Sequence, residues 1–171
     1  MLRIEIFKWH VSQMRFEPSL FDKLFERHSP LGSASTVRTL SLDELKHSMA
    51  GDLEALLNTR MTFSEAVMGP FPECASSMLT YGLNDFSACS LASSDDREFI
   101  CESIQRAIAR HEPRLKDVEV MLALHERSVS ALNFTIRALL VLHPAQELVN
   151  FDAQLQPSTH RYSVARTRGK A

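Results

Sequence analysis

Glycine and cysteine are scarce in this chain of 171 residues, which holds five glycines and three cysteines. No glycine-rich phosphate loop, no G-x-S-x-G nucleophile motif and no H-E-x-x-H zinc motif is present. Cys74, Cys89 and Cys101 are odd in number and widely spaced, a pattern that disfavours a disulfide framework and a zinc site. We expect them to be reduced, partly buried apolar residues.

A long hydrophobic run is also missing. No stretch approaches the roughly 18 to 20 apolar residues of a membrane helix, and Arg3, Glu5 and Lys8 interrupt the N-terminal segment, unlike a secretory leader. We therefore expect a cytoplasmic protein without membrane insertion. The net charge of -2 gives no general attraction for phosphate polymers. A nucleic-acid module would have to depend on the short basic tail alone.

The composition is that of an ordinary globular protein, with 44% apolar and 23% charged residues. A chain of this length favours one domain with a core of its own. We expect an N-terminal extension over residues 1–17, which could be a contact arm, a single domain over 18–165, and a basic tail over 166–171.

Helical signals come first along the chain. Pro18-Ser19 predicts the start of a helix, with Ser19 as its N-cap. Ser41 and Glu44 form a capping box at the start of a clearer helix, which should end near residues 58–60.

The next signals are a broken connector and a second long helix. Glycine and proline over residues 61–75 predict a loop, and a short turn over 76–81 should end at Gly82 in the left-handed conformation. A helix that opens at Asp95 has apolar residues at helical spacing and ends near His111.

Beyond residue 115 the apolar period changes from about 3.6 to 2, which indicates a sheet. Four runs alternate in this way, and their short connections favour antiparallel neighbours. The predicted fold is α+β, with N-terminal helices packed on a C-terminal antiparallel sheet of about four strands, the first and last of which form its edges. The inward residues are expected to be Val118, Val120, Leu122, Leu124, Phe134, Ile136, Ala138, Leu140, Leu142, Val149, Phe151, Ala153, Leu155, Tyr162 and Val164.

The junction between helix and sheet, His111-Glu112-Pro113-Arg114-Leu115, is the most informative segment. Proline stops the helix and pushes the residue before it into extended conformation. Glu112 and Arg114 then project to the same side of the chain. This charged pair could be internal, or it could bind a partner, and the residues alone favour neither alternative.

Catalytic patterns are weak. Glu102, Glu112 and Glu119 could be imagined as glycosidase acids, but Glu102 and Glu119 fall on polar faces where solvated carboxylates are expected. The seven histidines are scattered singly, which disfavours a metal site. We expect no catalytic residue, no cofactor and no metal.

Four ordered segments resemble the TssE family, the type VI secretion baseplate component related to the baseplate wedge protein of contractile phages. With the later strand pattern, the resemblance covers about residues 18–165. The four segments are Pro18-Ser19-Leu20-Phe21-Asp22-Lys23-Leu24, Asp52-Leu53-Glu54-Ala55-Leu56-Leu57-Asn58-Thr59-Arg60, Tyr81-Gly82-Leu83-Asn84-Asp85-Phe86-Ser87 and Glu112-Pro113-Arg114-Leu115.

The resemblance implies a structural subunit of a contractile injection machine, at a baseplate docked near the inner membrane. Glu112, Pro113 and Arg114 would contact the wedge core of TssF and TssG, with TssK in the same complex. A sheet edge would offer the sheath proteins TssB and TssC a strand template. The alternative is a peptidoglycan-cleaving glycosidase carried by the same machine. The expected sheath-binding edge strand consists of His160, Arg161, Tyr162, Ser163 and Val164.

Overall fold

The computed structural model describes residues 15–18, 39–63, 65–90, 93–123, 132–142, 145–156, 159 and 161–167. The chain divides into two compact units, Met1–Ala50 and Gly51–Ala171, and each is described by itself. The helix predicted from Ser19 onward lies outside the described residues.

In the first unit, an antiparallel bridge joins Phe16 to Leu40, with backbone hydrogen bonds of 2.9 and 2.7 Å. Helix α3, Leu42–Asn58, begins directly afterwards and continues into the second unit. The predicted capping box is confirmed, because the Ser41 N–H donates to Glu44 Oε2 at 2.8 Å and the Glu44 N–H donates to Ser41 Oγ at 3.3 Å.

The described residues of the predicted connector, 61–75, include two short helical pieces, α4 (Glu65–Met68) and η1 (Pro72–Cys74), and the turn predicted over 76–81 contains η2 (Met78–Thr80). After them, Gly82 has a φ of 116°, as the sequence predicts, and a Cβ built there would lie 2.5 Å from the Thr59 carbonyl oxygen. The Leu83 N–H donates to that same oxygen at 2.9 Å. A residue without a Cβ is therefore required where this turn passes the end of α3.

Helix α5, Ser94–His111, begins one residue before the predicted start at Asp95. Ser93 is the N-cap, since its side chain accepts a hydrogen bond from the Asp96 N–H at 3.3 Å. Asp95 lies instead in the first turn, where a carboxylate interacts favourably with the helix dipole. The predicted end at His111 is confirmed.

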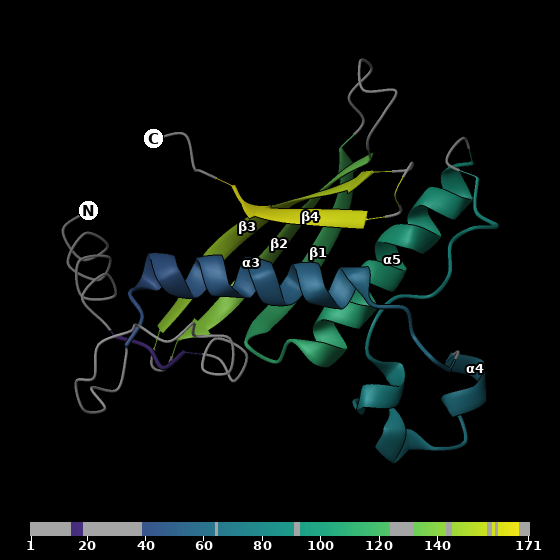
Figure 1. Ribbon diagram of the computed structural model, residues 1–171, viewed down its shortest axis with the longest axis horizontal. Helices are drawn as coiled ribbons and strands as arrows, with labels where there is room; N and C mark the ends of the chain where they lie inside the picture. The colour runs from purple at the N-terminus through teal and green to yellow at the C-terminus, as the bar shows by residue number, and fades with distance from the viewer. Residues whose placement is uncertain are drawn as a thin grey trace, which may run out of the picture. The chain divides into compact units, whose positions relative to one another are not determined.

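Four strands follow: β1 (Leu115–Ala123), β2 (Leu132–Leu142), β3 (Ala145–Gln156) and β4 (Arg161–Arg166). They form one antiparallel sheet in the order β1-β2-β3-β4 (Figure 1), which confirms the α+β prediction. The register of β1 against β2 shifts between Lys116 and Glu119, where Asp117 has a positive φ of 49°. This bulge lies directly after the Glu-Pro-Arg junction.

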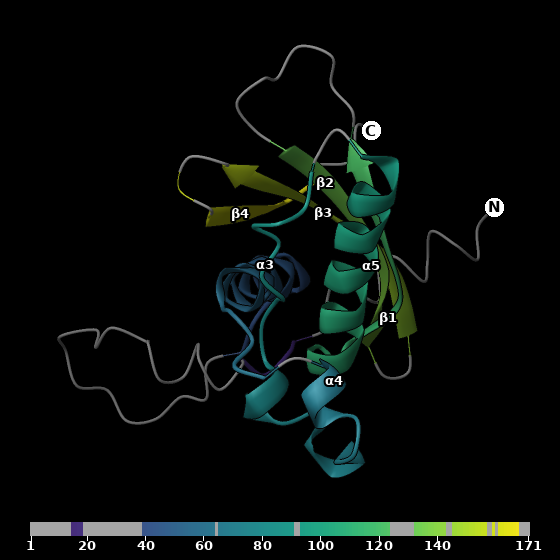
Figure 2. The same ribbon diagram turned by 90° about the vertical axis from the view of Figure 1, so that its right-hand side faces the viewer.

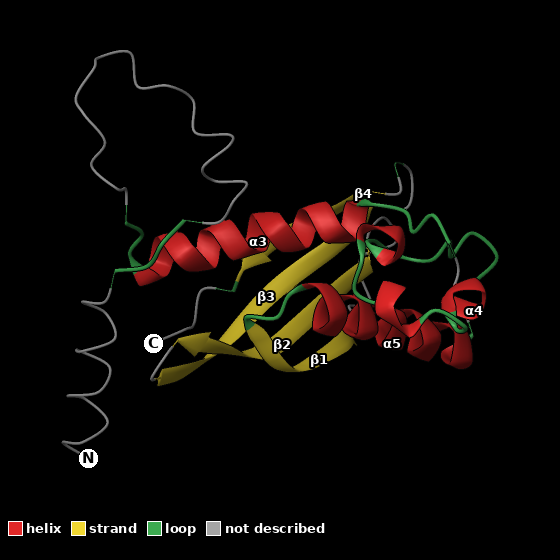
Figure 3. Cartoon of the chain, turned by 90° about the horizontal axis from the view of Figure 1, so that it is seen from below, coloured by secondary structure: helices red, strands yellow, loops and turns green. Residues whose placement is uncertain are grey.

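The core of the second unit lies between one face of the sheet and two helical segments. α5 and the C-terminal half of α3 lie on the same side of the sheet, with α5 beside β1 (Figures 2 and 3). Among the described residues, no helix is both long and apolar enough to cross a bilayer. Of the predicted inward residues of the sheet, Leu122 and Leu155 are only partly buried and Leu124 lies outside the described residues. The others are buried: Val118, Val120, Phe134, Ile136, Ala138, Leu140, Leu142, Val149, Phe151, Ala153, Tyr162 and Val164.

Candidate functional site

Arg114 lies between two carboxylates at the junction of α5 and β1. Its Nε donates to Glu112 Oε1 at 2.6 Å, and its Nη2 donates to Asp52 Oδ2 at 2.7 Å and also to Glu112 Oε2. Glu112 is 7% exposed. Glu112 and Arg114 do lie on the same side of the chain, and their pairing is internal to the fold.

The electrostatics of this site favour its charged form. Hydrogen bonding with Glu112 raises the pKa of Arg114; burial works in the other direction, and Asp52 adds to the increase. The pKa of Tyr81 is raised by burial, then by the negative charges of Asp52 and Glu112. Tyr81 therefore stays neutral beside the two carboxylates.

His111 connects the end of α5 to the segment before Gly82. Its Nε2–H donates to the Thr80 carbonyl oxygen at 2.8 Å, and its ring lies edge-on to Tyr81 with centroids 5.4 Å apart. The pKa of His111 is lowered by burial and by the charge of Arg110, against the opposing effect of the Thr80 hydrogen bond. The residues Asp52, Tyr81, His111, Glu112 and Arg114 are called the junction cluster below.

The residues predicted to bind the wedge core differ in what they expose. Pro113 is exposed and the Arg114 side chain is 32% exposed, whereas Glu112 is buried. Arg114 Nη1 has no hydrogen-bond partner within the described part of the chain. Only the proline ring and one edge of the guanidinium group are therefore available to another molecule, and Glu112 holds Arg114 in position.

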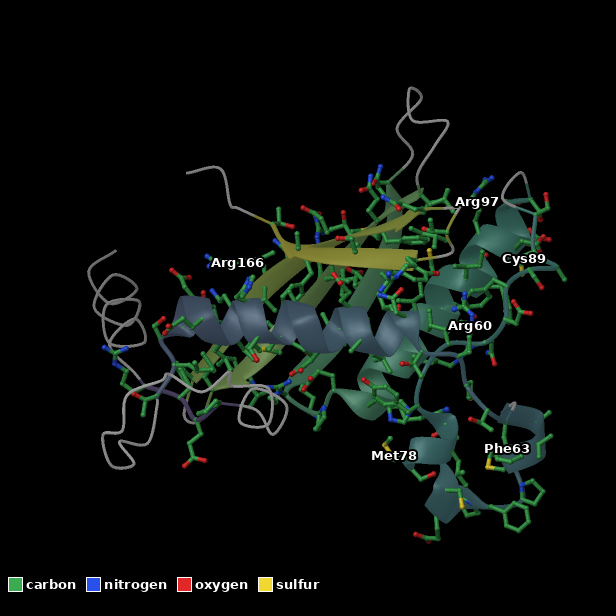
Figure 4. The ribbon with its side chains drawn as sticks, in the orientation of Figure 1. Arg60, Phe63, Met78, Cys89, Arg97 and Arg166 are labelled. Atoms are coloured by element: carbon green, nitrogen blue, oxygen red, sulfur yellow. The ribbon has the colours of Figure 1, made fainter. Side chains whose placement is uncertain are left out.

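The segment 61–81, here called the apolar lobe, was predicted from the sequence as a loop and a turn, without a function. It projects from the end of the second unit at which α5 ends (Figures 1 and 2), and Figure 4 labels two of its side chains, Phe63 and Met78. Met78 is 81% exposed. The signal in the sequence was several large apolar residues in a connector rich in proline and glycine. Its exposed large apolar residues are Phe63, Val67, Phe71, Met78 and Leu79.

At the edge of the sheet opposite to β1, the C-terminal part of α3 covers part of the outer edge of β4. Asn58 Nδ2 donates to the Tyr162 carbonyl and Asn58 Oδ1 accepts the Tyr162 N–H, both at 2.8 Å. Glu54 Oε2 accepts the Val164 N–H at 2.8 Å. Within the predicted sheath-binding segment these backbone groups already have partners, and His160 lies outside the described residues.

The carboxylates considered for glycosidase chemistry lie apart in structure and environment. Glu102 pairs with Arg106 at 3.3 Å on the surface of α5, Glu119 is exposed on β1, and Glu112 belongs to the junction cluster. Within the described residues, no three histidine, cysteine, aspartate or glutamate side chains gather into a metal-binding group. Cys74, Cys89 and Cys101 are free thiols and partly buried, as predicted.

Comparison with known families finds a match. Residues 43–145 match the family model described as baseplate wedge protein gp25, which spans more than half of the chain, from the first turn of α3 to the start of β3. A search of curated proteins found no match.

Proposed function

This chain belongs to the baseplate wedge protein gp25 family, a family of structural subunits of phage-tail-like baseplates, and on that premise we propose a specific role in a type VI secretion machine. The protein joins the wedge core of TssF and TssG, with TssK in the same complex, to the sheath proteins TssB and TssC. It acts in the cytoplasm, at a baseplate docked near the inner membrane.

The observation behind the wedge-core contact is the fixed position of Arg114, whose side chain is partly exposed next to the exposed Pro113. Glu112 and Asp52 hold two nitrogens of the guanidinium group, so docking costs little additional side-chain entropy. Nη1 points its donors at no described residue, and they suit a carboxylate or the free carbonyl groups at the end of a helix.

The apolar lobe supplies the surface that such a contact would cover. His111 of the junction cluster contacts two residues of the lobe, Thr80 and Tyr81, and Tyr81 belongs to both, so the lobe and the cluster adjoin each other in the second unit. Exposed large apolar residues beside a fixed arginine are the composition of a protein interface core. A helical partner with apolar residues around an acidic or carbonyl acceptor fits this end best.

The test measures how tightly the full chain binds purified TssF–TssG complex. We expect the double variant Phe71→Ser, Met78→Ser to bind about tenfold more weakly, because it removes two exposed anchors, and to unfold at the same urea concentration as wild type. Leu148→Ser is the matched control, since it changes an exposed apolar residue on β3, and it should bind as wild type does. Equal binding by the double variant and the control would overturn the assignment.

Arg114→Lys tests the guanidinium group itself. The positive charge remains near Glu112, but lysine cannot reproduce the fixed fork of donors. Capture of TssF–TssG should weaken, and Arg137→Lys on the exposed part of β2 is the matched control. Unchanged capture by Arg114→Lys would remove Arg114 from the interface.

The sheath contact is proposed on the opposite part of the second unit, at the β4 side of the sheet. A strand from TssB or TssC would extend the sheet by β-augmentation. Support comes from the antiparallel order, which leaves this side as one end of the sheet. Binding of the chain to purified TssB–TssC complex is the direct test, and absence of binding would remove this half of the proposal.

A further inference from the structure

The apolar lobe has no apolar core of its own. Its large side chains Phe63, Val67, Phe71, Met78 and Leu79 are all exposed, and no apolar side chain among its described residues is buried. Shared burial of apolar surface is what makes a segment open and close together with the rest of a domain. Packing therefore contributes little to holding the lobe against the second unit.

The backbone hydrogen bonds inside the lobe are local. The N–H groups of Cys74, Ala75, Ser77 and Thr80 each donate to the carbonyl three residues before, at 3.0 to 3.2 Å. These bonds close turns within the lobe and involve neither the sheet nor the long helices. Their amides exchange with solvent only when the turns open, so they report on the state of the lobe.

Hydrogen bonds to the rest of the second unit lie at the two ends of the lobe. At the first end, the Met61 N–H donates to the Leu83 carbonyl at 2.9 Å. At the second end, His111 Nε2–H donates to the Thr80 carbonyl at 2.8 Å. Between these ends, no hydrogen bond joins the described part of residues 62–79 to α3, α5 or the sheet.

The base of the lobe belongs to the core. Leu83 is 1% exposed, and its N–H donates to the Thr59 carbonyl at 2.9 Å. Gly82, with its positive φ of 116°, separates this anchored residue from the lobe. A movement of the lobe can therefore end at Gly82 and leave Leu83 in place.

Thr80 connects the turns of the lobe to α5. It is 2% exposed, and its hydroxyl donates to the Ala75 carbonyl at 2.7 Å. The carbonyl of the same residue accepts the His111 hydrogen bond. Because buried polar groups are costly to leave without partners, both bonds favour the lobe in its observed position.

We propose that the apolar lobe opens as a single segment, with the contact between Thr80 and His111 broken and the sheet, α3 and α5 intact. In the closed form, this contact holds the exposed apolar residues next to the junction cluster. TssF–TssG binds the closed form and shifts the equilibrium toward it. This last step rests on the proposed function, whereas the opening itself does not.

Native-state amide hydrogen exchange on the full chain tests the opening at single residues. The amides of Cys74, Ala75, Ser77 and Thr80 should have protection factors within about threefold of one another and about a hundredfold or more below that of Leu83. Protection equal to that of Leu83 would overturn the proposal. Four widely different values would overturn opening as a single segment.

Thr80→Val and His111→Phe test the contact that holds the lobe. Thr80→Val removes the hydroxyl at similar volume, and His111→Phe removes the donor but keeps an aromatic ring. Each should accelerate exchange at the Ser77 amide about tenfold. Thr62→Val is the matched control, since Thr62 is exposed in the same lobe and has no hydrogen-bond partner among the described residues. Unchanged exchange at Ser77 in both variants would overturn the role of this contact.

Ile136→Val separates the lobe from the core. Ile136 is fully buried in β2, so the substitution destabilises the sheet, which stays intact when the lobe opens. Exchange at Leu83 should rise about fivefold, whereas exchange at Ser77 should change by less than about twofold. Equal acceleration at both amides would show that the lobe opens only when the core unfolds, and would overturn the proposal.

Addition of TssF–TssG separates the opening from the proposed function. Saturating complex should slow exchange at the Ser77 and Thr80 amides of wild type at least about tenfold. Binding that leaves both rates unchanged would overturn the choice of the closed form by the partner and leave the opening standing. Absence of binding would overturn the wedge-core contact, while the exchange pattern of the free chain would still decide the opening.

Discussion

The side chain of Asn58 pairs with the backbone of Tyr162 through both of its polar atoms, each at 2.8 Å. An asparagine at the last residue of α3 thus takes the place that a neighbouring strand would have beside β4. Tyr162 itself is buried, and burial raises its pKa to about 12. The pairing therefore fixes the position of a core residue as well as the edge of the sheet.

Asn58→Ala should lower the free energy of unfolding by about 2 kcal/mol, because it leaves two partly buried backbone groups without partners. The amide of Tyr162 should then exchange faster than in wild type. Thr59→Ala is the matched control, since it removes a hydrogen bond within the same helical turn, and should cost about 0.5 kcal/mol or less. Equal effects in urea unfolding would contradict the strand-like role of Asn58.

Alanine substitutions at two glycines should change the free energy of unfolding in opposite directions. Gly82→Ala adds a Cβ 2.5 Å from the Thr59 carbonyl oxygen at a positive φ, and should destabilise the protein by about 3 kcal/mol. Gly51 lies in α3 with nothing within 4 Å of a Cβ, so Gly51→Ala should stabilise it by about 0.8 kcal/mol. Thermal unfolding measures both, and a mild effect at Gly82 would show that the turn can move away from α3.

These local features could be predicted from sequence because they depend on neighbours in the chain. The capping box at Ser41, the glycine turn and the change of period beyond residue 115 each have a short-range signature. The roles of Asn58 and Asp52 have none, since their partners Tyr162 and Arg114 are distant in the chain.

Arg114→Ala should cost about 3 kcal/mol of unfolding free energy, because it leaves the carboxylate of Glu112 buried without its cation. Glu102→Ala removes an exposed pair with Arg106 on α5 and should change stability by about 0.5 kcal/mol or less. Urea unfolding compares the two variants. A small effect at Arg114 would contradict its role as the cation that compensates the buried charge of Glu112.

His111 should make stability depend on pH. Its pKa is lowered in the folded state, with burial as the largest cause, so protonation favours the unfolded chain. The contribution of neutral His111 to the free energy of unfolding is complete at pH values above the pKa of the unfolded chain, about 6.5. It is lost as the pH falls below that value and through the lower pKa that His111 has in the folded protein. Urea midpoints at pH 5 and pH 7.5 (roughly one unit or more on either side) should differ less in His111→Gln, which retains a donor for Thr80. An unchanged difference would assign the pH dependence to other groups.

In the proposed function, one end of the second unit binds the wedge core while the sheet binds the sheath. The most direct measurement is light scattering of the full chain mixed with TssF–TssG and TssB–TssC complexes, resolved by size-exclusion chromatography. We expect one particle that contains all three components and is absent when the chain is omitted. Mutual displacement, in which the chain carries either TssF–TssG or TssB–TssC but never both, would contradict it.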